Sequence, residues 1–306
     1  EKRKQINYEN YFGSTPTNTF NSALSDLNQL EILFGDIYNP TETNASIEWS
    51  KLLGFSSYGE GHVIGTDINN SIFILGKANQ FSFGQSNDSD QDVFLSKFDS
   101  NGDKDWTKLL GIGDELQITD MEIYGNDSIF IVGSTQGYLN EKTNNYVAGA
   151  FIGKLDGDGN KEWIEVFGTR GDSVKDLSID NNGSIYMVGD DVSGEYGGND
   201  IFISKSDLNG NITKTKKWGT SNDEYAGGIT QDTFGNVYVT GRKAVFDGYK
   251  ITSEIFINKY ESSLNREYWN NYIPLSNGSF PTDIETIDFN YIYMVGTASN
   301  GFDGKN

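Results

Sequence analysis

Three aspartates that recur at matching positions are the residues of this sequence best suited to do chemistry. Asp120, Asp176 and Asp283 fall at related places in short β-type runs, and Gly228 replaces the acid in a further copy. Carboxylates that meet in one channel could act as general acid and general base on a glycosidic bond. A repeated Asp can equally bind neighbouring backbone amides, and no further motif for hydrolysis accompanies these acids. We therefore predict that the protein is not an enzyme, with a carboxylate-dependent, glycoside-active enzyme as the alternative.

Acidic loops are the second set of candidates, because clustered oxygen ligands bind hard cations. The loop 86–92 brings Asp88, Asp90 and Asp92 close together and is the best calcium candidate, although a solvated acidic loop is the competing interpretation. The run DGDGN from Asp156 begins like an EF-hand loop but continues with Lys161 where that loop needs Gly. We predict a structural turn there, and no cofactor apart from calcium as a candidate.

Composition excludes several classes of function. The chain has no Cys and a single histidine, His62, so thiolate chemistry, disulfides, Cys zinc sites and His clusters are excluded. The formal net charge of −21 repels phosphate backbones, so nucleic acid is an unfavourable partner, and anionic lipid surfaces are disfavoured for the same reason. No apolar run approaches the roughly 20 residues of a membrane-spanning helix. Basic partners, metal cations and neutral saccharides remain.

An internal repeat organises the chain from Ile47 onward. Runs such as SIFIVG and SIYMVG end in glycines that are 52 to 57 residues apart: Gly76, Gly133, Gly189, Gly241 and Gly296. A second run carries lysines in register: Lys97, Lys154, Lys205 and Lys259. A third run carries tryptophans: Trp49, Trp106, Trp163 and Trp269, with Trp218 shifted in the remaining copy. Because they recur in every copy, we assign the lysines and tryptophans to the scaffold.

Each copy predicts four β-strands joined by Asp/Asn/Gly turns. The two middle strands of a copy, such as IFIVG, are apolar on both faces. A sheet of this kind is stable only when other sheets cover both of its faces. Radial stacking of such sheets satisfies this need and leaves only short edges, so the fold class is all-β and the predicted architecture is a β-propeller with four-stranded blades.

The repeat resembles that of a known family. The run DLSIDNNGSIYMVG followed by GGNDIFISKSDLNG, and then a Trp strand in most copies, is similar to the SBBP β-propeller repeat over residues 47–306. That resemblance implies a propeller of about seven blades. It also implies a secreted or surface-exposed bacterial protein, so we expect an extracellular or cell-surface location.

The strand count gives the predicted domain boundaries. Residues 1–40 do not match the repeat and form an N-terminal extension, for which the spacing of Ala23, Leu24, Leu27 and Leu30 favours a short helix. Residues 41–306 form the propeller. Strands around Trp49 would complete the last sheet and close a ring of five blades; the alternative is a fragment of a six- or seven-bladed propeller.

Recognition is expected on the loops that vary between copies. Loops after the second strand of a copy, and loops between copies, share one face of a propeller and differ in length. We predict that this face carries the ligand-contacting residues Tyr138, Tyr146, Tyr196, Tyr249, Asp223 and Glu224.

The predicted function is that of a non-enzymatic surface or extracellular propeller. It would act as an interaction or structural module, contacting a protein or a glycan, in an appendage or a surface layer. The N-terminal extension is a candidate for self-assembly. Besides the glycoside-active enzyme, a calcium-stabilised adhesion scaffold is the remaining alternative.

Overall fold

The computed structural model describes residues 59–79, 91–110, 116–140, 145–246, 251–275, 279–287 and 291–297. Within these ranges every regular element is a β-strand and every pairing is antiparallel, as the repeat predicted. None of the described residues forms a helix that could cross a membrane. The helix expected within residues 1–40 lies outside the described ranges.

The strands form four four-stranded sheets and a two-stranded sheet, each in simple chain order. Sheet 1 contains β1 (Gly59–Thr66), β2 (Ile72–Asn79), β3 (Gln91–Phe98) and β4 (Lys104–Leu109). Sheet 2 contains β5 (Leu116–Tyr124), β6 (Ser128–Asn140), β7 (Asn145–Asp156) and β8 (Lys161–Phe167). Sheet 3 contains β9 (Ser173–Ile179), β10 (Ile185–Asp191), β11 (Asp200–Ser206) and β12 (Ile212–Trp218). Sheet 4 contains β13 (Glu224–Gln231), β14 (Val237–Phe246), β15 (Ile251–Tyr260) and β16 (Glu267–Leu275), and sheet 5 contains β17 (Phe280–Ile287) and β18 (Tyr291–Thr297).

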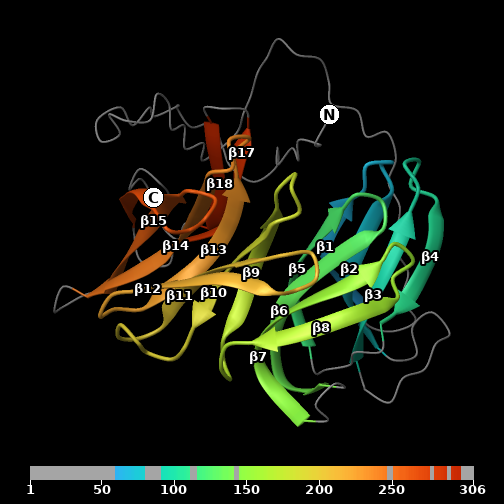
Figure 1. Ribbon diagram of the computed structural model, residues 1–306, viewed down its shortest axis with the longest axis horizontal. Helices are drawn as coiled ribbons and strands as arrows, with labels where there is room; N and C mark the ends of the chain where they lie inside the picture. The colour runs from blue at the N-terminus through green and yellow to red at the C-terminus, as the bar shows by residue number, and fades with distance from the viewer. Residues whose placement is uncertain are drawn as a thin grey trace, which may run out of the picture.

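The sheets are stacked in chain order, as the colours of Figure 1 show. The first strand of each sheet contacts the first strand of the next, from β1 to β5, β9, β13 and β17. This stack of repeated sheets is consistent with a β-propeller.

The middle strands supply the core from both faces. On β6, Ile129 and Ile131 pack in the cluster between sheets 1 and 2, whereas Phe130 and Val132 pack in the cluster between sheets 2 and 3. Two further clusters fill the spaces between sheets 3 and 4 and between sheets 4 and 5. Each fully buried large apolar side chain contributes roughly 1.5–3 kcal/mol. The prediction that neighbouring sheets cover both faces is therefore confirmed for sheets 2, 3 and 4.

The Asp/Gly turns are structural, as predicted. In each of six turns one carboxylate oxygen accepts the backbone N–H groups two and four residues further on: those opened by Asp67, Asp99, Asp156, Asp180, Asp207 and Asp232. In five of them a Gly in the left-handed region, with φ between 77° and 81°, completes the turn. Asp156 is one of the six, so the DGDGN run is a turn.

The recurring glycine within each second strand lies opposite an irregularity in the first strand. The register of β10 against β9 shifts between Val188 and Gly189, and equivalent shifts occur in the other four sheets. At Gly189 an added Cβ would overlap the carbonyl oxygen of Ser173 and the ring of Phe202. Glycine therefore recurs here because two backbones approach too closely for a side chain.

Replacing Gly189 by Ala should destabilise the protein by about 1–3 kcal/mol, because backbone must move to admit the methyl group. The matched control is Gly61→Ala, an exposed glycine whose added Cβ would meet only a side-chain methyl of Ile74, at 3.6 Å. The control should change the free energy of unfolding by less than about 0.5 kcal/mol. Urea denaturation measures both, and equal effects would contradict the close-approach explanation.

Candidate functional site

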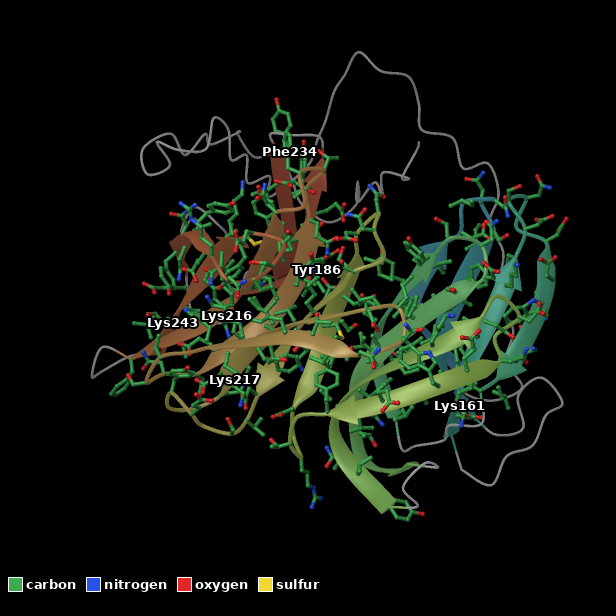
Figure 2. All side chains as sticks on the ribbon, viewed as in Figure 1. Lys161, Tyr186, Lys216, Lys217, Phe234 and Lys243 are labelled. Atoms are coloured by element: carbon green, nitrogen blue, oxygen red, sulfur yellow. The ribbon has the colours of Figure 1, made fainter. Side chains whose placement is uncertain are left out.

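The loop face of the structure is best described at sheets 3 and 4. It is formed by the β8–β9 loop (168–172), the β10–β11 loop (192–199) and the β12–β13 loop (219–223). Figure 2 shows Lys217 and Lys243 on this side, with Phe234 at the opposite end of sheet 4. We name this surface the sheet 3–4 rim.

Buried carboxylates hold the β10–β11 loop in place. Asp172 accepts the backbone N–H of Thr169 (2.7 Å) and that of Val192 (3.0 Å) through its two oxygens. Asp191 accepts the N–H of Ser193 at 2.8 Å and pairs with the Lys217 ammonium at 2.5 Å. Both carboxylates are buried, and such charge-assisted bonds are stronger than neutral ones. The start of the loop is therefore fixed to sheet 3.

The other end of this loop is fixed in the same way. Asp200 is fully buried and accepts the N–H of Tyr196 at 3.0 Å. Asp223 accepts the N–H of Asn199 at 2.9 Å, and this bond connects sheet 4 to the loop of sheet 3. The Asn199 amide donates in turn to the carbonyl of Glu224 at 2.9 Å.

The predicted ligand-face acids thus turn out to serve the scaffold. Asp223 is half-buried and is used as described. Glu224 is fully buried, and its carboxylate accepts both the backbone N–H (2.8 Å) and the hydroxyl (2.5 Å) of Thr220. Burial raises the pKa of Glu224. The prediction that Glu224 contacts a ligand is wrong, because its charged group is used inside the β12–β13 loop.

The predicted aromatic residues have different positions. Tyr196 is 48% exposed at the rim and Tyr146 is 70% exposed near the end of β7. The backbone of Tyr138 pairs with Val147 in the extended β6–β7 hairpin. Tyr249 lies outside the described residues. The two of these tyrosines whose side chains the structure describes, Tyr146 and Tyr196, are therefore both exposed.

The calcium candidate is described only in part. Asp88 and Asp90 lie outside the described residues. Asp92 is buried, and its carboxylate accepts the N–H of Val93 at 2.7 Å. Within the ranges that the structure describes, no three acidic, His or Cys side chains are grouped so as to hold a metal ion.

The first-strand aspartates connect successive sheets. The N–H of Leu177 donates to Asp120 at 3.2 Å, and the N–H of Ile229 donates to Asp176 at 2.7 Å. Burial raises the pKa of Asp120, and burial together with the charge of Asp120 raises the pKa of Asp176 well above its usual value. The charge of Asp283 adds to this increase. The interpretation that these acids bind neighbouring backbone is confirmed for Asp120 and Asp176.

Trp106 and Trp163 pack between sheets, as predicted. The ring of Trp106 lies against Gly159 of the next sheet, and the ring of Trp163 lies against Gly210 in the same way. Each also contacts the second-strand aromatic of its own sheet, Phe73 or Phe130. Three rim residues were not predicted from the sequence, because none of them stands out from the acidic and basic residues around it: Asp172, Asp200 and Lys217.

Comparisons with known proteins give limited relationships. No family model matches the chain. A stretch of 139 residues is 27% identical to the regulatory protein FlaEY of Caulobacter vibrioides and covers 43% of this chain. The matched stretch spans only 14% of that protein.

Two solved structures that resemble this chain are enzymes. A tryptophan-to-alanine mutant of the Synechocystis apocarotenoid oxygenase has a TM-score of 0.39 and 12% identity, covering 75% of this chain and 52% of its own. A luciferin-regenerating enzyme has a TM-score of 0.28 and 11% identity, covering 73% of this chain and 78% of its own. The prediction that the protein is not an enzyme is withdrawn. At these values the likeness assigns no reaction, substrate or cofactor to this chain.

Replacing Asp176 by Asn should stabilise the protein increasingly as pH rises from 4 to 7. A carboxyl whose pKa is raised by folding stabilises the folded state at low pH, and this contribution is lost as pH rises through the folded pKa. The asparagine oxygen can still accept the Ile229 N–H. The free energies of unfolding of both proteins, measured by urea denaturation across this range, test the effect.

Asp207→Asn is a control of opposite sign. A hydrogen bond from the Asn211 side chain is the main cause that lowers the pKa of Asp207. This contribution to stability is present above the unfolded pKa and is lost as pH falls through the folded pKa. Asp207→Asn should therefore lose stability relative to the natural chain as pH rises. Equal slopes for the two variants would contradict the assigned environments.

Proposed function

We propose that this chain is a β-propeller of five blades that acts as an interaction module at the cell surface or outside the cell. The sheet 3–4 rim is its binding surface, and the partner is a protein. The observation that carries the proposal is the contrast within the β10–β11 loop. Its backbone is held by buried carboxylates, while Val192 and Tyr196 remain 44% and 48% exposed.

A loop held in this way suits protein recognition. Binding costs the conformational entropy of every segment that must be ordered, and a loop already fixed at both ends avoids much of that cost. Exposed Tyr side chains supply large contact areas with few rotatable bonds. The Lys217 ammonium, shared between Asp191 and Glu195 at 2.5 and 3.6 Å, holds the acidic part of the loop beside these apolar groups.

The net charge restricts the kinds of partner that can bind, and the repeat indicates where the protein is located. A chain of net charge −21 attracts basic surfaces and repels nucleic acid and anionic lipid. The resemblance to the SBBP repeat supports a secreted or surface-exposed bacterial protein. Membership of that family remains a proposal, as does the location.

Closure of the ring is part of the proposal. Sheet 5 has two described strands where sheets 1 to 4 have four. The segment around Trp49 repeats the pattern of the fourth strands, as at Trp106 and Trp163. We assign residues 41–53 to the two strands that complete sheet 5 beside β18, so that sheet 5 joins sheet 1. A longer propeller is the alternative.

Hydrogen exchange tests the closure. If residues 41–53 complete sheet 5, deletion of residues 1–53 should remove the protection of β18 amides that the full chain shows, because these amides lose their partner strand. The amides of β10 provide the internal control and should stay protected. Unchanged protection of β18 would contradict closure by the N-terminal segment.

Site-specific photo-cross-linking tests the rim. A photoreactive phenylalanine analogue at Tyr196 should give a discrete adduct in cells of the source organism. The control position is Phe234, which is 72% exposed on the β13–β14 turn at the opposite end of sheet 4. An adduct from Tyr196 alone supports the proposal; identical adducts from both positions, or none from Tyr196, overturn it.

A further inference from the structure

A shallow pocket of about 270 Å³, open to solvent, lies between sheets 1 and 2 at the end that carries the short Asp/Gly turns. Its wall consists of Lys97, Asn126, Asp127, Asp156, Gly157 and Asp158. Lys97 projects from β3 of sheet 1, whereas the other five belong to the β5–β6 and β7–β8 turns of sheet 2. The pocket is on the face opposite to the rim, and neither its geometry nor its chemistry rests on the proposed function.

Two hydrogen bonds hold sheets 1 and 2 together beside this pocket. The side-chain amide of Asn69, in the β1–β2 turn, donates to the Asn126 oxygen at 3.0 Å. The ammonium of Lys108, on β4, donates to the Asn160 oxygen at 2.9 Å. In sheet 1, β3 lies between the β1–β2 turn and β4. Lys97, on β3, therefore faces sheet 2 between these two inter-sheet hydrogen bonds.

The same junction is closed between sheets 3 and 4. There Tyr186 and Lys205 occupy the positions of Phe73 and Lys97 in the strand register. The Tyr186 hydroxyl (2.9 Å) and the Lys205 ammonium (3.0 Å) both donate to the carbonyl of Ser262, in the β15–β16 turn of sheet 4. The lysine also donates to the tyrosine hydroxyl at 2.9 Å, so both the hydroxyl and the ammonium have hydrogen-bond partners at this junction.

Between sheets 1 and 2 the hydroxyl of this network is absent, because Phe73 stands at the position of Tyr186. The Lys97 ammonium lies 5.1 Å from the centre of the Phe73 ring, and among the described residues it makes no hydrogen bond or ion pair. Gly157 stands where Ser262 stands in sheet 4. The equivalent lysine of sheet 2, Lys154, pairs with Glu162 of its own sheet at 2.8 Å. Of the four repeated lysines, Lys97 is therefore the one whose ammonium lines a pocket without a hydrogen bond or ion pair to another residue in the described ranges.

The charges around the pocket restrict its ligand. One ammonium and three carboxylates (Asp127, Asp156 and Asp158) line the pocket, so its net charge opposes an anion. Among the described residues its carboxylates are not grouped so as to hold a metal ion. A neutral ligand with several hydroxyl groups satisfies both kinds of partner, because each hydroxyl can donate to a carboxylate and accept from an ammonium. The volume lies just below the roughly 300–1,000 Å³ of sites for drug-sized ligands, which suits one sugar ring.

We propose that the pocket between sheets 1 and 2 binds a single neutral saccharide unit, free or as part of a glycan, with Lys97 donating to the sugar and Asp127 and Asp158 accepting from its hydroxyls. Asp156 is already occupied by the backbone N–H groups of Asp158 and Asn160. It shapes the turn and leaves the two exposed aspartates for the ligand.

The test titrates the full chain with glucose, galactose, mannose, N-acetylglucosamine and their methyl glycosides, followed by NMR. At least one sugar should bind saturably and shift the amide signals of 126–127 and 156–158. Phe73→Tyr installs the hydroxyl of the closed junction, so it should reduce binding at least about tenfold while leaving the protein folded. Lys97→Met should do the same through loss of the donor, and the matched control Lys154→Met should bind as the natural chain does.

Other outcomes overturn the proposal. Failure of every sugar to bind does so, as does binding that both Phe73→Tyr and Lys97→Met leave unchanged. Methyl glycosides that bind as well as free sugars indicate a unit within a glycan, and selective binding of free sugars indicates a small molecule; both support the site. Sulfate, calcium and alanine are titrated in parallel, and stronger shifts of the pocket amides with any of them overturn the assignment to a neutral saccharide.

Discussion

The constraint on which this structure depends is that its middle strands are apolar on both faces. Ile131 and Val132 are neighbours on β6, yet they are buried in the cores on opposite sides of sheet 2. Such a sheet buries its apolar area only between two others, so the sheets must stack in series and cannot form a single sandwich. Stacking brings first strands side by side and leaves turns and loops at the two ends of the sheets. We therefore expect binding sites on the loops and turns at the two ends of the sheets, or between neighbouring sheets at those ends.

Acidic residues perform much of the positioning that follows from this stacking. Asp176 binds the backbone of the next sheet, Asp207 closes a turn, and Asp172 fixes a rim loop. The same chemical group is used in three environments that shift its pKa differently: burial and a second carboxylate raise the pKa of Asp176, whereas donated hydrogen bonds lower that of Asp207. The net charge of −21 thus partly reflects backbone amides that need acceptors, and it overstates the number of carboxylates free to meet a partner.

The sequence predicted the features that repeat, because repetition shows that each sheet needs them. Turn aspartates, inter-sheet tryptophans and the apolar middle strands all lie where their pattern placed them. Glu224 was misassigned because its partner, Thr220, is four residues away in a loop whose path no pattern reveals. The roles of Asp172 and Lys217 were missed for a different reason, since each depends on contacts between segments about 20 or more residues apart. Features that every copy shares can therefore be predicted from the repeat, whereas contacts that occur in a single copy cannot.

Differences between copies nevertheless indicate where a binding site could lie, once the strand register shows which residues are equivalent. Phe73 and Tyr186 differ by one oxygen, and both pack in the core between their own sheet and the next. In one junction that oxygen joins a lysine to a carbonyl of the next sheet; in the other its absence leaves the lysine facing a pocket. In the closed junction the hydroxyl and the ammonium share one carbonyl and bond to each other, so a junction can be either closed by its own side chains or open to a ligand. A stacked repeat can therefore gain a binding site by losing one structural hydrogen bond, while the cores on either side of the sheet stay intact.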